Sequence, residues 1–244
     1  MLRRELDRAA GRALTVVDVG GGTGGFAVPL AEAGHRVTVV DASPDALAAL
    51  TRRAADAGVA DRVTAVQGDG DGLADLVEAS SADLVLCHSL LEVVDDPSSV
   101  VGALAAALKP GGAASVLVAN RAAAVLARAV AGHLASAGAL LDDPDGGEPP
   151  EGARRDLPRR RYDAASANRL LRGAGLVVEE IHGVRVIADL LPGSVADADQ
   201  SALLAFELAA SARSPYRDIA TQLHLLARRP DSAQRSPSAD RAAA

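Results

Sequence analysis

Val17-Asp-Val-Gly-Gly-Gly-Thr-Gly24 is the stretch that decides the fold of this 244-residue chain. It overlaps a short apolar run over 14–19, which predicts a buried strand. Glycines directly after a strand allow a tight turn and let the backbone approach a ligand closely. The helix predicted over 24–33 then points the free N–H groups of its first turn at that ligand, where they favour an anion. The stretch therefore predicts a strand, a ligand-binding turn and a helix.

Strand and helix patterns continue to alternate after this unit. The alternation with short connections predicts a parallel sheet with helices on both faces, an α/β fold. The predicted strands are rich in β-branched residues and lack polar alternation, which is typical of strands buried on both sides. Further strands are predicted at 36–40, 62–67, 83–87 and 113–119, and helices at 44–56 and 97–108, with a charged helix end over 2–12.

The rhythm changes after Asn120. One Ala-rich helix is predicted over 121–141, followed by a loop over 142–161 that is rich in Pro, Gly and charge. The remaining elements expected are a helix at 163–173, a strand at 176–188, a helix at 199–212 and a last strand at 219–227. We therefore expect a single domain over 1–229, with substrate-side insertions at 121–165 and 190–215, and a disordered tail at 230–244.

Composition narrows the class of protein. Hydrophobic residues make up 49% of the chain, enough to bury a core. The only cysteine, Cys87, excludes an intrachain disulfide and a cysteine-based metal cluster, so no metal site is expected. The net charge of −7 and the 2% aromatic content argue against non-specific nucleic-acid binding and base stacking. No apolar run approaches the ~20 residues of a membrane span, and the charged start does not resemble a signal peptide. We expect a cytoplasmic protein without a membrane partner.

The position of Asp41 indicates that the predicted ligand contains a nucleoside. It lies 41 − 20 = 21 positions after Gly20, at the end of the second predicted strand, where a carboxylate can accept both hydroxyls of a ribose. This acid suits NAD and S-adenosylmethionine equally, and Gly20, Gly22 and Gly25 also satisfy the dinucleotide spacing G-x-G-x-x-G. The alternative for Asp41 is to cap the helix that follows Ala42.

A third acid and two later motifs separate these ligands. Val66-Gln-Gly-Asp-Gly70, the region 83–97 and Lys109-Pro-Gly-Gly112 occur in an order that resembles the class I S-adenosylmethionine-dependent methyltransferases. That resemblance implies a Rossmann-like doubly wound sheet of seven strands with the last antiparallel, and S-adenosylmethionine as cofactor. It also implies that Asp69 contacts the adenine amino group. The cofactor-binding residues expected are Asp18, Gly20, Gly21, Gly22, Gly24, Asp41, Ala42, Asp69, Gly70 and His88.

A narrower resemblance rests on five further stretches: His88-Ser-Leu-Leu-Glu-Val-Val-Asp-Asp-Pro97, Gly183-Val-Arg-Val186 with Asp189, 203–207, Pro215-Tyr216 and 223–230. These stretches are similar to the bacterial tRNA 5-carboxymethoxyuridine methyltransferase group. The resemblance covers residues 12–230 and implies methyl esterification of a carboxylate on a modified wobble uridine. That group has an additional N-terminal segment with an arginine that meets the cofactor. Here we expect Arg3 or Arg4 to replace it, or the true start to lie upstream.

Esterification makes modest chemical demands. A carboxylic acid with a pKa near ~4 is ionised at neutral pH, so it needs a cation to orient it and no general base. Arg185 is the first candidate for that cation, and the basic run over 154–161 is the next, although it could also bind tRNA phosphates or be a solvated loop. His88 is expected to cover the adenine, touch the substrate or cap a helix. His224 is expected in the core, and Glu92 and Asp95 are either structural or substrate-facing.

Several functions remain open at this point. The leading hypothesis is a tRNA-modifying methyltransferase, and the second is a methyltransferase acting on a small carboxylic acid or hydroxyl metabolite. A basic stripe beside the cofactor would favour tRNA, and an enclosed apolar pocket would favour a metabolite. A cofactor-binding regulator without catalysis and an NAD-dependent oxidoreductase are the alternatives from other classes.

Overall fold

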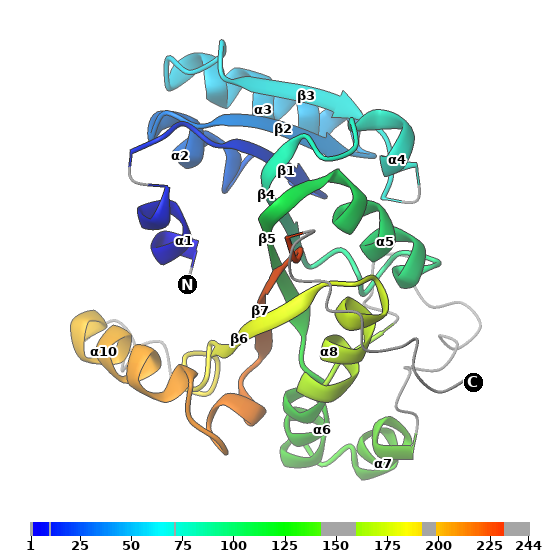
Figure 1. The fold of residues 1–244 in the computed structure, drawn as a ribbon. Coiled ribbons are helices and arrows are strands. Elements are labelled where there is room, and N and C mark those ends of the chain that lie inside the picture. Colours follow the sequence, from blue (N-terminus) through cyan, green and yellow to red (C-terminus); the bar gives the residue numbers. More distant parts are fainter. Residues whose placement is uncertain (1, 10, 71, 143–159, 192–198, 232–244) are drawn as a thin grey trace, which may run out of the picture.

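A seven-stranded sheet organises the computed structural model, which describes residues 2–9, 11–70, 72–142, 160–191 and 199–231 (Figure 1). Its strands run in the order β3-β2-β1-β4-β5-β7-β6. Pairings from β3 through β5 are parallel, and β7 is antiparallel to both β5 and β6. The strands are β1 Thr15–Val19, β2 Arg36–Asp41, β3 Val63–Gln67, β4 Ala82–His88, β5 Leu108–Ala119, β6 Val177–Val184 and β7 Gln222–Arg228. The predicted doubly wound sheet with an antiparallel last strand is confirmed.

Helices cover both faces of this sheet (Figure 1). One apolar cluster contains Val85, Leu104 and Leu171 and packs under α5 and α8. The other contains Leu50 and Leu86 and packs under α2 and α3. The helices are α1 Leu2–Arg8, α2 Ala27–Glu32, α3 Pro44–Asp56, α4 Leu73–Leu76, α5 Pro97–Ala107, α6 Arg121–Val130, α7 Leu134–Asp142, α8 Ala164–Gly173, α10 Gln200–Ser211 and the 3₁₀ helix η1 Arg217–Ile219.

The predicted single helix over 121–141 is wrong. The chain forms two helices, α6 and α7, separated at Gly132, whose φ of 82° interrupts the helix. The predicted strand over 176–188 is also too long, because β6 ends at Val184 and Arg185 turns the chain with a φ of 59°. The last strand begins at Gln222 and not at 219, since η1 occupies 217–219.

Some further parts of the chain either had no predicted element or lie outside the described residues. The short helix α4 was not predicted, since four residues carry no periodic pattern. Most of the predicted loop over 142–161, and the predicted tail beyond Asp231, lie outside the described residues. Within the described residues, no helix is both long enough and apolar enough to span a bilayer.

The sheet's direction decides where a ligand can sit. Strands β2 and β4 lie on opposite sides of β1, so the two connections leaving the carboxyl ends of β1 and β4 diverge and open a crevice between them. The glycine turn follows β1 at this end. The sheet order therefore places the turn at the switch point where α/β proteins bind nucleotides.

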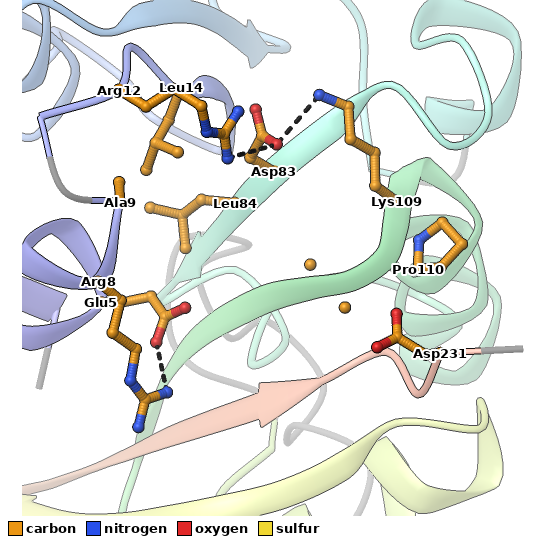
Figure 2. Close-up of a pocket in the computed structure, with 12 residues that line it drawn as sticks. Glu5, Arg8, Ala9, Arg12, Leu14, Asp83, Leu84, Lys109, Pro110 and Asp231 are labelled. Atoms are coloured by element: carbon orange, nitrogen blue, oxygen red, sulfur yellow. Dashed lines mark hydrogen bonds and ion pairs between the residues drawn. The ribbon is translucent and has the colours of Figure 1, made fainter. Parts of the chain in front are cut away.

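The opposite end of the sheet is held by charged side chains (Figure 2). Asp83 accepts a hydrogen bond from the Thr15 N–H at 2.9 Å and forms ion pairs with Lys109 at 3.1 Å and Arg12 at 3.2 Å. Burial alone would raise the pKa of Asp83, but the N–H group and the two cations together lower it. These contacts surround a cavity of about 350 Å³ and join the starts of β1, β4 and β5. This end of the sheet is therefore structural.

We predict that Asp83→Asn destabilises the fold by about 1–3 kcal/mol, because a largely buried charged acceptor loses its cationic partners. Urea unfolding at pH 7 measures the change. Asp56→Asn, at an exposed position at the end of α3, is the matched control and should change stability by less than about 0.5 kcal/mol. Equal stability of the two variants would show that the Asp83 contacts do not hold this end together.

Candidate functional site

The glycine turn is shaped by close packing beneath it. Gly20 has a φ of 73°, and its N–H group donates to the Val40 carbonyl at 2.7 Å. A Cβ atom on Gly21 would lie 2.6 Å from the Asp18 carboxylate, and one on Gly24 would lie 2.3 Å from Leu50. Side chains are therefore excluded from both positions. The backbone of the turn remains available to a ligand, and the helix begins later than predicted, at Ala27.

Asp41 ties this turn to the end of β2. Its Oδ2 accepts a hydrogen bond from the Gly22 N–H at 2.8 Å, and its Oδ1 accepts one from the Ser43 N–H at 2.9 Å. The helix cap of α3 is Ser43, which accepts from the Ala46 N–H. The capping alternative for Asp41 is thus taken by Ser43, and Asp41 itself joins two of the segments that form the predicted ligand site.

A cavity of about 320 Å³ lies at the carboxyl ends of β1, β2 and β3. Five predicted cofactor residues line it together, and a loop that we did not assign to the cofactor closes its other side. That loop, residues 89–96 between β4 and α5, is named here the β4–α5 loop. The lining residues are Gly20, Val40, Asp41, Ala42, Gly68, Asp69, Gly70, Leu90, Val93, Val94 and Asp95.

Asp69 lines the same cavity, after the end of β3. Its Oδ1 accepts a hydrogen bond from the Gly72 N–H at 3.0 Å, which orders the turn after β3. The adjoining Gly70 is close-packed as well, because a Cβ atom there would lie 3.2 Å from Val100. A lining that combines the carboxylates of Asp41 and Asp69 with apolar Leu90 suits a nucleoside, whose base is flat and apolar and whose rim is polar.

Asp18 is a buried acid beneath the glycine turn. Its side chain is 2% exposed, and Oδ2 has no hydrogen-bond partner among the described residues. Burial, and secondarily the charge of Asp41, raise the pKa of Asp18 to about 7. A cation bound nearby would favour the ionised form. The orphaned oxygen, buried beneath Gly21, fits a cofactor that carries an ammonium and a sulfonium.

His88 lies in a different cavity from the predicted adenosine site. Its Nε2 is 2.9 Å from the Ser115 Oγ, which is 2.7 Å from the Nε2 of His224. Burial lowers the pKa of His88 to about 4 and that of His224 to about 3, so both rings are neutral at pH 7. His88 also meets Phe26 edge-on, and these groups border a largely apolar cavity of about 500 Å³. The expectation of a core His224 is confirmed.

Arg185 is engaged with a neighbouring acid. Its Nε donates to the Asp189 Oδ1 at 2.9 Å, and the Asp189 Oδ2 accepts from the Thr221 hydroxyl at 2.7 Å. The Arg185 side chain is 54% exposed. Its predicted substrate-orienting role is not tested by this geometry and stays a prediction.

Arg161 supplies a cation that sequence analysis identified only as part of the basic run. It lines a third, mostly apolar cavity of about 760 Å³ beside α6, together with Asn120, Arg128 and Val186. Burial and the nearby Arg128 lower its pKa, while Glu92 opposes the shift. Its guanidinium donates no hydrogen bond to any other described residue. Arg154, Arg155 and Arg159 of the same run lie outside the described residues.

Glu92 and Asp95 belong to the β4–α5 loop. Glu92 is 3% exposed, and its Oε1 accepts the Ala119 N–H at 2.6 Å, which fixes the loop to the end of β5. Asp95 lines the cavity of about 320 Å³, which is called the nucleoside cavity below after the ligand predicted for it. In the part of the chain that the structure describes, no group of three His, Cys, Asp or Glu residues is arranged to hold a metal ion.

Comparisons with known proteins agree with this geometry. Residues 16–112 match the model of a family described as a methyltransferase domain. The chain is 31% identical over 237 residues to the tRNA 5-carboxymethoxyuridine methyltransferase of Escherichia coli K12, covering 95% of this chain and 88% of that protein. It is 36% identical over 117 residues to a ubiquinone biosynthesis O-methyltransferase of Xanthomonas axonopodis pv. citri, 48% of each.

Solved structures share the fold. An S-adenosylmethionine-dependent methyltransferase from Mesorhizobium loti superposes with a TM-score of 0.60 at 21% identity, over 93% of this chain and 95% of that one. A putative sarcosine dimethylglycine methyltransferase from Galdieria sulphuraria superposes with a TM-score of 0.61 at 17% identity. The strand order described above is therefore common to these proteins.

We predict that Asp41→Ala weakens binding of S-adenosylhomocysteine by about 1–3 kcal/mol, because the ribose hydroxyls lose a charged acceptor. Isothermal titration measures the affinity. Asp45→Ala, in the exposed first turn of α3, is the control and should bind as the unmodified protein does. Unchanged affinity of the Asp41 variant would show that the ribose lies elsewhere.

Asp18 should make stability depend on pH. Its folded pKa of about 7 lies above the unfolded value of about 3.9, so between these pH values the unfolded chain has lost a proton that the folded protein still holds. The free energy of unfolding should therefore fall as pH rises from about 4 to 7, and stay lowered above 7. Denaturant titrations of the ligand-free protein at pH 5 and pH 8 measure this, and Asp18→Asn should reduce the difference. The same pH dependence in both proteins would contradict a raised pKa at Asp18.

Proposed function

Because the chain belongs to the class I S-adenosylmethionine-dependent methyltransferases, we propose that it methylates a carboxylate, by esterifying a modified wobble uridine in tRNA. S-adenosylmethionine supplies an electrophilic methyl group on a sulfonium, which needs little activation. The protein has to bind the cofactor, orient the acceptor and exclude water. The observation that supports a carboxylate as acceptor is Arg161. This cation is half-buried at an apolar cavity and has no hydrogen-bonded partner among the described residues.

The cofactor residues follow from the 320 Å³ cavity. We assign the ribose hydroxyls to Asp41 and the adenine amino group to Asp69, with Ala42 and Gly70 beside the nucleoside. The glycine turn would take the amino-acid part, and Asp18 would compensate its ammonium. Supporting this assignment, Gly21 and Gly24 leave no room for side chains and Asp18 has an unpartnered buried oxygen.

Arg161 would orient the acceptor. An acceptor carboxylate is ionised at neutral pH, and a guanidinium fork matches its two oxygens. Partial burial strengthens such a pair, because water screens it less. Arg161 shares its cavity with Arg128, so two cations border the space. Nucleophilic attack by an ionised carboxylate on the methyl group requires no proton removal, so this reaction needs no general base.

Arg185 remains a second acceptor-side cation in this proposal. Its partner Asp189 lines the same cavity as Arg161, and Asp189 is held by both Arg185 and Thr221. Arg185 would then act on the acceptor indirectly, by holding the Asp189 carboxylate in place at the cavity wall. The roles predicted for Arg185 and His88 stay predictions, and the proposal adds Arg161 as a group expected to touch the acceptor.

Methylation of a small acid or hydroxyl metabolite is the second candidate. The apolar lining of the 760 Å³ cavity favours it, and so does the similarity of about half the chain to ubiquinone biosynthesis O-methyltransferases. The net charge of −7 also offers tRNA little general attraction. Against it, similarity to the tRNA-modifying relative extends over 95% of the chain.

Transfer of label separates the candidates. Methyl-labelled cofactor is supplied with bulk tRNA or with a small-molecule extract, and the labelled fraction is then treated with mild alkali. An ester in tRNA releases its label as methanol, whereas a methyl ether or N-methyl group is retained. Alkali-stable label, or label found only among small molecules, would overturn the proposal.

We predict that Arg161→Ala lowers kcat/KM for the acceptor by about 10- to 100-fold, the loss expected for one charged hydrogen-bonded partner. The affinity for S-adenosylhomocysteine should stay within twofold, because Arg161 does not line the nucleoside cavity. Arg161→Lys should retain part of the rate. Arg172→Ala, exposed at the end of α8, is the control. A loss of cofactor affinity equal to the loss of rate would contradict an acceptor role for Arg161.

A further inference from the structure

The β4–α5 loop, residues 89–96, forms one wall of the nucleoside cavity through Leu90, Val93, Val94 and Asp95. A loop between a strand and a helix has carbonyl groups that neither element can pair, and each needs a partner when it is partly buried. Within the loop, the Leu90 carbonyl accepts from the Val93 and Val94 N–H groups, and the Glu92 carboxylate binds the end of β5. Four further carbonyls of the loop have their partners in another segment: those of Leu91, Glu92, Val94 and Asp95.

The partners come from a segment about 65 residues later. The Arg160 N–H donates to the Glu92 carbonyl at 3.1 Å. The Arg160 guanidinium donates to the Val94 carbonyl and, at 2.9 Å, to the Asp95 carbonyl. The Tyr162 hydroxyl donates to the Leu91 carbonyl at 3.0 Å. Four carbonyls of one loop thus accept from two residues of another segment.

This donor segment is itself firmly attached. Tyr162 is 7% exposed, its N–H donates to the Ala119 carbonyl at 2.9 Å, and its carbonyl accepts from the Arg121 N–H at 2.9 Å. These bonds fix it to the end of β5. Arg160 therefore extends from a rigid base, and its planar fork spans two consecutive carbonyls that a single-point donor would not span equally well.

Arg160 and Tyr162 act at different places on the loop. Val94 and Asp95, whose carbonyls Arg160 binds, line the nucleoside cavity. Leu91, whose carbonyl Tyr162 binds, is 1% exposed and points into the core. Removal of the Arg160 guanidinium would leave the carbonyls of Val94 and Asp95, in the cavity wall, without these donors. Removal of the Tyr162 hydroxyl would leave the Leu91 carbonyl without its donor, at a residue whose side chain is held in the core.

We propose that Arg160 is a positioning residue for the adenosine half of the cofactor. Its guanidinium holds the Val94–Asp95 backbone as the cavity wall without touching the ligand. The neighbouring Arg161 lines the acceptor cavity, so two adjacent residues serve the two substrates from one short segment. This role is independent of which acceptor is methylated.

The test compares two ligands that share adenosine. S-adenosylhomocysteine carries the amino-acid half and 5′-methylthioadenosine lacks it. Titration calorimetry with Arg160→Gln should show both affinities reduced by the same factor, about tenfold, the loss expected for charged hydrogen bonds. Arg160→Lys should fall between this variant and the unmodified protein, and Arg172→Gln, an exposed arginine of α8, should bind both ligands normally.

A structural control separates positioning from general loosening. Tyr162→Phe removes a bond to the same loop, and should lower the thermal unfolding midpoint while leaving both affinities within twofold. If Arg160→Gln does not fold, the Lys variant carries the same comparison. Unchanged binding of both ligands by the Arg160 variants would overturn the proposal. Weakening of S-adenosylhomocysteine alone, or an equal loss of affinity in Tyr162→Phe, would overturn it too.

Discussion

Close contact between the glycine turn and the residues beneath it is the constraint on which the rest of the site depends. Side chains at Gly21 and Gly24 would overlap Asp18 and Leu50, so the turn can sit directly on the sheet only as bare backbone. This packing brings the Gly22 N–H within 2.8 Å of Asp41 and so joins β1 to β2 at their carboxyl ends. The cavity of about 320 Å³ proposed for the nucleoside lies at these strand ends.

Few of the groups around this cavity are charged without a partner. Asp18 is buried near Asp41, and both burial and the Asp41 charge disfavour its ionised form, which raises the pKa of Asp18 to about 7. A cofactor with two positive groups offsets that cost only when it is bound. On the other side, His88 and His224 remain neutral because burial disfavours their charged forms. Acidic side chains thus lie at the glycine turn and the end of β2, and neutral histidines lie in β4 and β7.

The β4–α5 loop and the segment at 160–162 contact each other and line the two cavities that we propose for cofactor and acceptor. Glu92 fixes the loop to Ala119 in β5, and Arg160 holds its outer carbonyls. Arg161, between the two anchored residues, lies at the 760 Å³ cavity. The geometry of both cavities therefore depends on a contact between segments that are about 65 residues apart in the chain.

Local patterns in the sequence determined the sheet, the glycine turn and the acids Asp41 and Asp69, because each follows a strand and parallel strands bring their carboxyl ends to one edge. They could not determine that Asp41 binds the Gly22 N–H, or that Arg160 binds the carbonyls of the β4–α5 loop. Neither could they single out Arg161 from its basic run, because the cavity that it lines is formed with residues of α6 and η1. Those outcomes rest on hydrogen bonds, burial and distances between residues far apart in sequence, and only the tertiary structure brings such residues together.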